Sequence, residues 1–217
     1  MKIILTGATG MIGEGILLEC LQDERVHEVL SVSRRACGKS HPKLKEYIVP
    51  EFLDLQPNDP QLAGYDACFF CAGVSSVGME KATYEKLTYD TTMAFAHAIG
   101  NQPQLAFVYV SGGGTDRSEK GRLHWARVKG KTENDLLKLP FKNAFGFRIG
   151  MMKPAVGQVH VLKYYNYFGW LAPFLETFFP NVISTMRQVA NAMIRVCDEG
   201  YPSNIIYVKD IRKLAKK

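Results

Sequence analysis

Along the first 150 residues, short apolar runs alternate with longer segments in which apolar residues recur every three or four positions. The short runs, bounded by turn residues, are typical of buried strands, and the longer spacing is typical of amphipathic helices. The predicted strands are residues 2–6, 29–33, 47–49, 67–71, 105–111 and 144–147, and the predicted helices are 12–22, 79–99 and 123–137. This alternation predicts an α/β protein, a three-layer Rossmann fold whose doubly wound parallel sheet has helices on both faces.

Beyond residue 148 the pattern is less regular, with predicted helices at 159–168 and 189–197 and a last strand at 204–208. Eight of the 24 aromatic residues lie within sixteen positions of this part. They are Tyr164, Tyr165, Tyr167, Phe168, Trp170, Phe174, Phe178 and Phe179. No repeat or linker divides the chain, so we expect one domain over 1–217, to which residues 151–200 add a small helical and aromatic C-terminal substrate lobe.

Composition narrows the class of protein. With 47% hydrophobic and 22% charged residues, the chain is unlike disordered, collagen-like or disulfide-scaffold proteins. The net charge is +6, of which +4 lies in a predicted basic tail, residues 209–217. Because the remainder is nearly neutral and contains no nucleic-acid-binding motif, no nucleic-acid partner is expected.

The cysteines indicate a cytoplasmic protein with free thiols, since five is an odd number and their spacing matches no disulfide framework. Cys68 and Cys71 are three positions apart in one predicted strand, so their side chains face opposite sides of the sheet and cannot share a metal ion. The histidines stand singly, which predicts no metal site. The opening apolar run is too short for a signal peptide, and no apolar run is long enough to cross a membrane.

The most specific motif is the glycine turn between the first predicted strand and helix, with sequence GATGMIG. Glycines at this spacing allow a tight turn and a close approach of the backbone to a pyrophosphate, which then meets the helix N-terminus. The motif therefore predicts a dinucleotide site, and a glycine-rich turn without a ligand is the less favoured interpretation. Its expected contacts are Gly7, Thr9, Gly10, Met11, Ile12 and Gly13.

The second predicted strand ends in Ser33-Arg34-Arg35, and Arg34 lies 21 residues after Gly13. A dinucleotide fold selects its ribose at about this position, where an acid would bind a 2′-hydroxyl and an arginine would pair with a 2′-phosphate. Two arginines and no acid predict NADP rather than NAD. The alternative is a solvated basic turn.

These features resemble the short-chain dehydrogenase/reductase superfamily, in particular its small atypical and extended members, among them oxidoreductases like TAT-interacting protein and the NAD-dependent epimerase/dehydratase-like proteins. The resemblance covers about residues 1–150. It implies a serine at the end of the fifth strand, Ser111, and an active-site lysine, Lys129, followed by Gly130 and Glu133. It also implies cofactor contacts at Asp54-Leu55, at Cys71-Ala72-Gly73 and at Arg148, which begins an Arg148-Ile149-Gly150 segment with isoleucine where the family has proline.

The chain departs from the family at the position four residues before the lysine, where Trp125 replaces the tyrosine that transfers a proton. Indole has an N–H donor but no useful acidity, so Trp125 can orient a substrate and cannot be the acid. His124, Tyr164 and Tyr165 are the candidate replacements, each with a structural role as the alternative.

Two functions stay open at this point. One is an NADP-dependent oxidoreductase acting on a small apolar carbonyl or alcohol, with epimerase or dehydratase chemistry as a variant. The other is a non-catalytic protein that senses NADPH and signals to a protein partner. The aromatic segment is interpreted as a lid over the substrate, as a homodimer or membrane-surface patch, or as local core.

Overall fold

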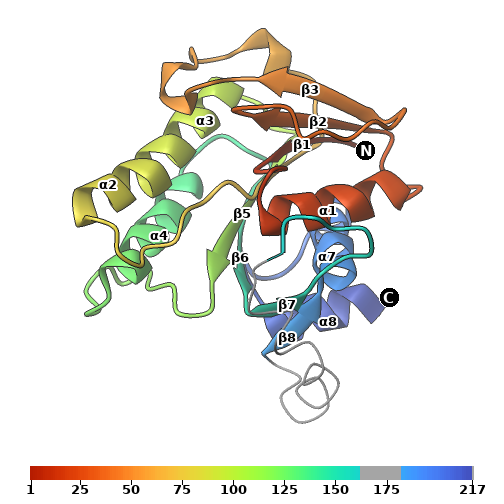
Figure 1. Ribbon diagram of the computed structural model, residues 1–217. Helices are drawn as coiled ribbons and strands as arrows, with labels where there is room; N and C mark the ends of the chain where they lie inside the picture. Colours follow the sequence, from red (N-terminus) through yellow and green to blue (C-terminus); the bar gives the residue numbers. More distant parts are fainter. Residues whose placement is uncertain (162–181, 217) are drawn as a thin grey trace.

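A seven-stranded parallel sheet organises the computed structural model, which describes residues 1–161 and 182–216 (Figure 1). The strand order is β3-β2-β1-β4-β5-β6-β9. The strands are β1 Lys2–Thr6, β2 Glu28–Ser33, β3 Leu44–Ile48, β4 Ala67–Phe70, β5 Ala106–Gly112, β6 Asn143–Ile149 and β9 Ile205–Tyr207. A separate parallel pair is formed by β7 Met151–Lys153 and β8 Ile183–Thr185. The prediction of a doubly wound parallel sheet is confirmed.

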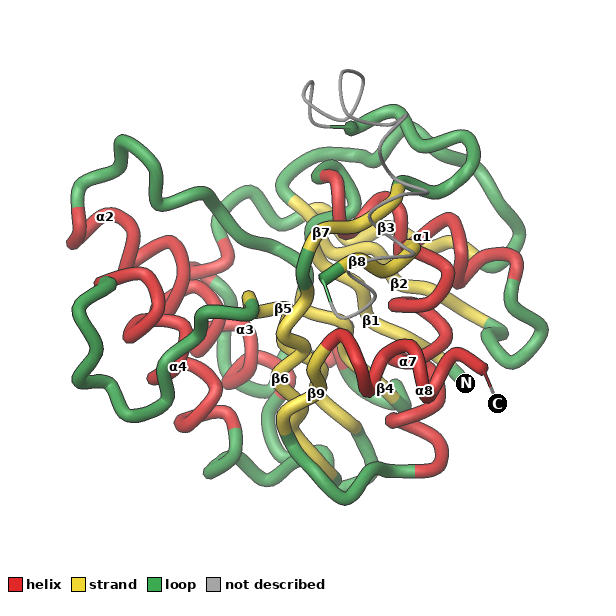
Figure 2. The backbone as a smooth tube through the Cα atoms, turned by 90° about the horizontal axis from the view of Figure 1, so that it is seen from below, coloured by secondary structure: helices red, strands yellow, loops and turns green. Residues whose placement is uncertain are grey.

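Helices cover both faces of the sheet, as the view from below shows (Figure 2). One face carries α1 Met11–Gln22, α7 Met186–Glu199 and α8 Val208–Lys216. The other carries α2 Lys81–Glu85, the π-helical turn η3 Lys86–Asp90, α3 Thr91–Ile99 and α4 His124–Leu136. The short 3-10 turns are η1 Phe52–Asp54 and η2 Pro60–Leu62.

Successive side chains of each apolar strand point alternately toward these two helix layers. Ile3 and Leu5 of β1 belong to the core under α1 and α7, and Ile4 belongs to the core under α3. Cys68 and Cys71 divide in the same way, Cys68 into the α3 layer and Cys71 against the α1 layer. Burial on both faces explains why these strands are continuous apolar runs.

The chain reverses its direction of travel across the sheet between β1 and β4. It runs from β1 through β2 to β3 on one side, and from β4 through β5 and β6 to β9 on the other. In open α/β sheets, ligands bind in the crevice beyond the carboxyl ends of the strands at such a reversal. The glycine turn after β1 therefore lies where a dinucleotide is expected.

Several elements differ from the sequence prediction. The third strand is Leu44–Ile48 rather than 47–49, and the helix predicted at 79–99 contains the π-helical turn. Residues 159–161 are not helical, so the helix predicted to begin there is wrong at its start. The rest of that helix and the aromatic segment with Tyr164 and Tyr165 lie outside the described residues.

The predicted basic tail is instead a docked helix, α8. Val208, Ile211 and Leu214 recur at helical spacing and are buried against the α7 layer. The basic residues Lys209, Lys213 and Lys216 are exposed on its outer side. The helix carries four basic residues and Asp210, so a net charge of +3, half of the surplus, lies on a packed helix.

Candidate functional site

The glycine turn is shaped by contacts that leave no room for side chains. Gly7 has φ +75°, and a Cβ atom there would lie 2.8 Å from the backbone of Cys71 and Ala72. A Cβ atom at Gly13 would lie 2.1 Å from the carbonyl oxygen of Gly7. The N-cap of α1 is Gly10, which makes no side-chain capping bond, so the first N–H groups of the helix stay available for an anion.

The end of β4 is held against this turn by Thr6. Its hydroxyl oxygen accepts hydrogen bonds from the amides of Cys71 and Ala72, both at 3.1 Å. The segment Cys71-Ala72-Gly73 therefore runs directly beside Gly7. The structure thus brings together two of the segments in which cofactor contacts are predicted.

We expect Gly13→Ala to damage both folding and dinucleotide binding. Alanine favours the helix by about 1 kcal/mol relative to glycine, but overpacking typically costs about 1–3 kcal/mol, and here the obstacle is backbone rather than a movable side chain. NADPH affinity should fall at least about tenfold because the turn must open. Urea unfolding and NADPH fluorescence titration measure the two effects.

Gly10→Ala is the matched comparison for stability, since its Cβ atom would lie 3.4 Å from the Gly7 carbonyl oxygen, within ordinary contact. Equal unfolding free energies for the two variants would contradict the steric account of Gly13.

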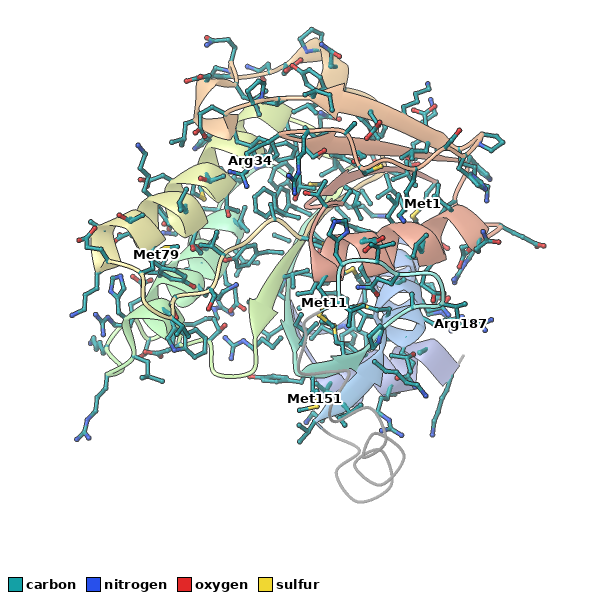
Figure 3. The ribbon with its side chains drawn as sticks, viewed as in Figure 1. Met1, Met11, Arg34, Met79, Met151 and Arg187 are labelled. Carbon is teal, nitrogen blue, oxygen red and sulfur yellow. The ribbon has the colours of Figure 1, made fainter. Side chains whose placement is uncertain are left out.

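The residues proposed for the adenosine end follow β2 and β3. Ser33 is buried and donates its hydroxyl to the carbonyl oxygen of Arg35 at 2.8 Å. Arg34 and Arg35 are exposed, and Figure 3 labels Arg34. Asp54 and Leu55 line a separate cavity of about 480 Å³ beyond β3. Both arginines are accessible to an anionic ligand.

A buried ion pair lies under the ends of β5 and β6. Arg148 Nη2 donates to Glu133 Oε2 at 2.8 Å, and Arg148 Nε donates to Glu133 Oε1 at 3.3 Å. Ser111 donates its hydroxyl to the same carboxylate at 2.6 Å. Burial opposes the charge of Arg148, but the Glu133 carboxylate outweighs it and the pKa of Arg148 is raised. Ser111 and Arg148, predicted to contact substrate and cofactor, thus share Glu133.

Lys129 lies one turn before Glu133 on α4 and points at the sheet. Its ammonium donates to the carbonyl oxygen of Val110 at 3.3 Å and lies 5.4 Å from the centre of the Tyr109 ring. Burial lowers the pKa of Lys129 to about 8, although the nearby Glu133 carboxylate opposes this shift. Lys129 therefore lies next to the main chain that leads into Ser111.

Trp125 packs on the glycine cluster that ends β5. A Cβ atom at Gly114 would lie 2.9 Å from its indole ring, and one at Gly112 would lie 3.8 Å away. His124 is turned toward α2, where its ring packs against Tyr84 and its Nε2 lies 3.2 Å from the carbonyl oxygen of Lys81. These contacts give His124 a structural role and leave the acid unassigned among the residues predicted for it.

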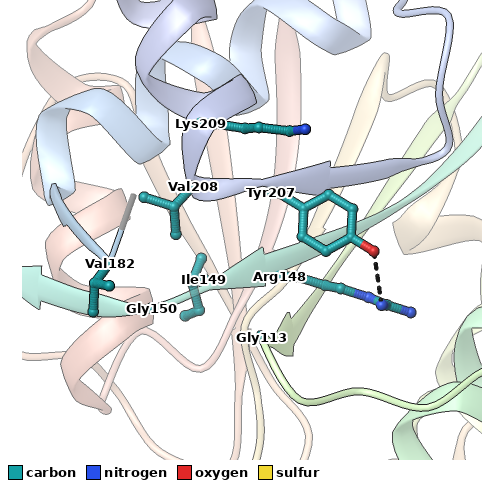
Figure 4. A pocket seen from close by; sticks show the side chains of 8 residues that line it. All are labelled: Gly113, Arg148, Ile149, Gly150, Val182, Tyr207, Val208 and Lys209. Carbon is teal, nitrogen blue, oxygen red and sulfur yellow. Dashed lines mark hydrogen bonds between the residues drawn. The ribbon is translucent and has the colours of Figure 1, made fainter. Parts of the chain in front are cut away.

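A cavity of about 460 Å³ opens beyond the ends of β5 and β6 (Figure 4). Its apolar side consists of Ile149, Val182 and Val208, and its polar side of Arg148, Tyr207 and Lys209. Arg148 Nη1 donates to the Tyr207 hydroxyl at 3.1 Å. Gly113 also lines the cavity, so it adjoins the glycine cluster on which Trp125 packs.

The sequence analysis did not single out two residues, Tyr207 in this cavity and Glu14 beside the glycine turn. Tyr207 stands in a short strand with no motif around it, so no local signal marks it. Glu14 follows the third glycine of the turn, and a charged residue on the buried side of an amphipathic helix is a signal that the sequence does contain.

The described residues contain no cluster of three or more His, Cys, Asp or Glu side chains placed to hold a metal ion. Within the same ranges, no helix combines the length and apolar character needed to cross a membrane.

Comparison with known proteins identifies the family. Residues 3–114 match the model of the NAD dependent epimerase/dehydratase family. The chain is 30% identical over 155 residues to "Protein FMP52, mitochondrial" of Eremothecium gossypii, a match that covers 70% of this chain and 66% of that protein. A protein of the same name from Aspergillus fumigatus is 24% identical, with the same coverage. The chain thus spans just under two thirds of the length of these relatives. Both relatives are named as mitochondrial, and the cytoplasmic location of this protein stays a prediction.

Solved structures share the fold at low sequence identity. A short chain dehydrogenase family protein from Francisella tularensis has a TM-score of 0.62 and 17% identity, over 95% of each chain. UDP-glucose 4-epimerase from Thermotoga maritima has a TM-score of 0.64 and 16% identity, over 100% of this chain and 82% of that one. With the family match over half of its length, this chain belongs to the NAD dependent epimerase/dehydratase family.

Proposed function

We propose that the protein binds NADP and transfers hydride between this cofactor and a small carbonyl compound or alcohol. The observation that carries the proposal is the glycine turn, in which Gly7 and Gly13 have no space for a Cβ atom and the first amides of α1 stay open. In this proposal the described residues form one cofactor-binding unit. When bound, NADPH supplies the hydride.

NADP rather than NAD is proposed because Arg34 and Arg35 are exposed at the end of β2, while Ser33 bonds back to the main chain. Arginine pairs with phosphate through charge-assisted hydrogen bonds, and no carboxylate at this position would repel it. NAD⁺ is the cofactor named for an enzyme of the same fold, WbmF from Bordetella bronchiseptica. The preference for NADP over NAD must therefore be tested at the residues proposed to bind the adenosine ribose.

We expect the double variant Arg34→Ser/Arg35→Ser to bind NADPH about 100-fold more weakly and NADH with little change. Each lost charged hydrogen bond is worth about 1.5–3 kcal/mol, and solvent exposure reduces that value. Fluorescence titration with both cofactors measures the ratio. The control is Arg187→Ser/Lys213→Ser, which removes two exposed cations from α7 and α8. Wild-type protein that binds NADH at least as tightly as NADPH would contradict NADP selection.

The remaining residues have positioning roles in this proposal. Lys129 binds the nicotinamide ribose, and Trp125 with the glycine cluster forms an apolar wall beside it. Ser111 can polarise a carbonyl only after its hydroxyl turns from Glu133, which retains Arg148 as its partner. Consumption of NADPH at 340 nm over a panel of small carbonyl compounds tests turnover.

The second candidate function, a non-catalytic NADPH sensor, is supported by Trp125 and Ser111 together. The indole N–H is too weak an acid, and the serine hydroxyl is engaged by Glu133, so neither Trp125 nor Ser111 supplies the proton donor. A protein that binds NADPH and consumes none with any carbonyl compound of the panel would be a cofactor sensor rather than an enzyme.

A further inference from the structure

Three neighbouring strands place Ser111, Arg148 and Tyr207 side by side. Ser111 of β5 is in register with Arg148 of β6, and Arg148 is in register with Tyr207 of β9. Neighbouring residues in register point to the same face of a sheet, and strands are about 4.8 Å apart. Tyr207 therefore shares a face and an edge of the sheet with Ser111, two strands away.

Tyr207 combines an anchored main chain with an accessible side chain. The residue is 42% exposed and lines the cavity of about 460 Å³ that also reaches Gly113. Its amide donates to Asp210 Oδ2 at 3.0 Å, which fixes the start of α8. Because the hydroxyl oxygen accepts from Arg148 Nη1, its own hydrogen is free to donate into the cavity.

The charges around this hydroxyl suit a proton donor. The Arg148 guanidinium lies 5.4 Å from the centre of the ring and is held in place by Glu133. Lys209, the second residue of α8, also lines the cavity and is a second cation. The acids facing this region are Glu133, paired with Arg148, and Asp210, which accepts bonds from Tyr201 and from the Tyr207 amide. Positive charge therefore lies beside the oxygen that becomes negative when the proton leaves.

We propose that Tyr207 is the proton donor of the reduction, replacing the tyrosine absent at Trp125. The inference rests on the proposed function. The carbonyl carbon accepts a hydride from the reduced nicotinamide, which is oxidised, and the π electron pair of the C=O bond moves to oxygen. That oxygen takes the phenol proton, which gives the alcohol, and the tyrosinate beside Arg148 recovers a proton from water at its exposed side. In the oxidation of an alcohol each transfer is reversed.

The test compares Tyr207→Phe with Tyr201→Phe, a tyrosine that bonds to Asp210 outside the cavity. We use the carbonyl compound that wild-type protein reduces fastest, and measure single-turnover NADPH oxidation together with NADPH affinity. Loss of a general acid typically costs about 10²–10⁴ in rate. Tyr207→Phe should lose at least about 100-fold in rate with NADPH affinity unchanged, and Tyr201→Phe should match wild type in both.

The outcomes separate this inference from the proposed function. If wild type reduces a carbonyl compound and Tyr207→Phe does so at a similar rate, Tyr207 is not the donor while the proposed function stands. If wild type binds NADPH but reduces no carbonyl compound, the reductase proposal fails and this inference fails with it. Circular dichroism melting of both variants confirms that the exposed ring has been replaced without unfolding the protein.

Discussion

Glu133→Gln is expected to lower the free energy of unfolding by about 3–5 kcal/mol, the usual cost of removing one partner from a buried ion pair. The Glu133 side chain is 1% exposed and that of Arg148 is 9% exposed. The amide keeps the shape and can still accept from Ser111, but the guanidinium stays in the interior without its counter-charge. The free-energy cost of removing this guanidinium from water is then no longer offset by attraction to a carboxylate.

Urea unfolding of three proteins tests this account. The double variant Glu133→Gln/Arg148→Met removes the charge from both positions and should recover part of the loss, since a neutral pair carries no unpaired charge. Glu199→Gln is the matched control, because the Glu199 side chain is 53% exposed and its ion pair with Arg195 at 3.6 Å should contribute about 0–1 kcal/mol. A loss below about 1 kcal/mol in Glu133→Gln would show that the pair is unimportant for folding.

The parts of the site that the sequence can predict are those formed by neighbouring residues in the chain. The glycine turn and the ends of β2 and β5 are local patterns, each marked by an apolar run that ends in a few turn or polar residues. Their positions were predicted from the sequence because hydrophobic period and turn chemistry act over short distances. The Lys129 and Glu133 positions followed from the resemblance alone.

The partners of Arg148 depend on information that no local pattern contains. Its contact with Tyr207 requires β9 to add in parallel beside β6 in one register, 59 residues further along the chain. A shift of one residue would turn Tyr207 to the opposite face. The packing of α8 depends on the same strand, which explains why a basic amphipathic segment could be read as a tail.

The acid Glu14 was overlooked for a related reason, since its three partners come from two distant segments. Lys39 Nζ lies 2.7 Å from Glu14 Oε1, and the amides of Val159 and His160 donate to the carboxylate at 3.1 and 2.6 Å. Gln158 adds a bond to the carbonyl oxygen of Met11 at 2.6 Å. Glu14 thus joins the loop after β2 and the segment after β7 to the first turn of α1.

Glu14→Gln is expected to lower the free energy of unfolding by about 3 kcal/mol at neutral pH, and this loss should disappear in acid. Burial alone would raise the pKa of Glu14, but Lys39 and the amides of His160 and Val159 outweigh it and lower the pKa to about 2. A carboxyl group that titrates at about 4.5 when unfolded and at about 2 when folded stabilises the protein fully above pH 4.5. That contribution, about 1.4 kcal/mol per unit of pKa difference, is lost as the pH falls from 4.5 toward 2.

Unfolding in urea at about pH 7 and about pH 3 measures the difference between wild type and the variant at each pH. The difference should be largest at neutral pH and should shrink by at least half at the lower pH, because protonation turns the wild-type carboxylate into a neutral group like the amide. Glu24→Gln, an exposed acid beyond the other end of α1, should change stability little at either pH. A difference that stays constant between the two values would mean that Glu14 acts through its shape and hydrogen bonds, and that its charge does not hold the three segments together.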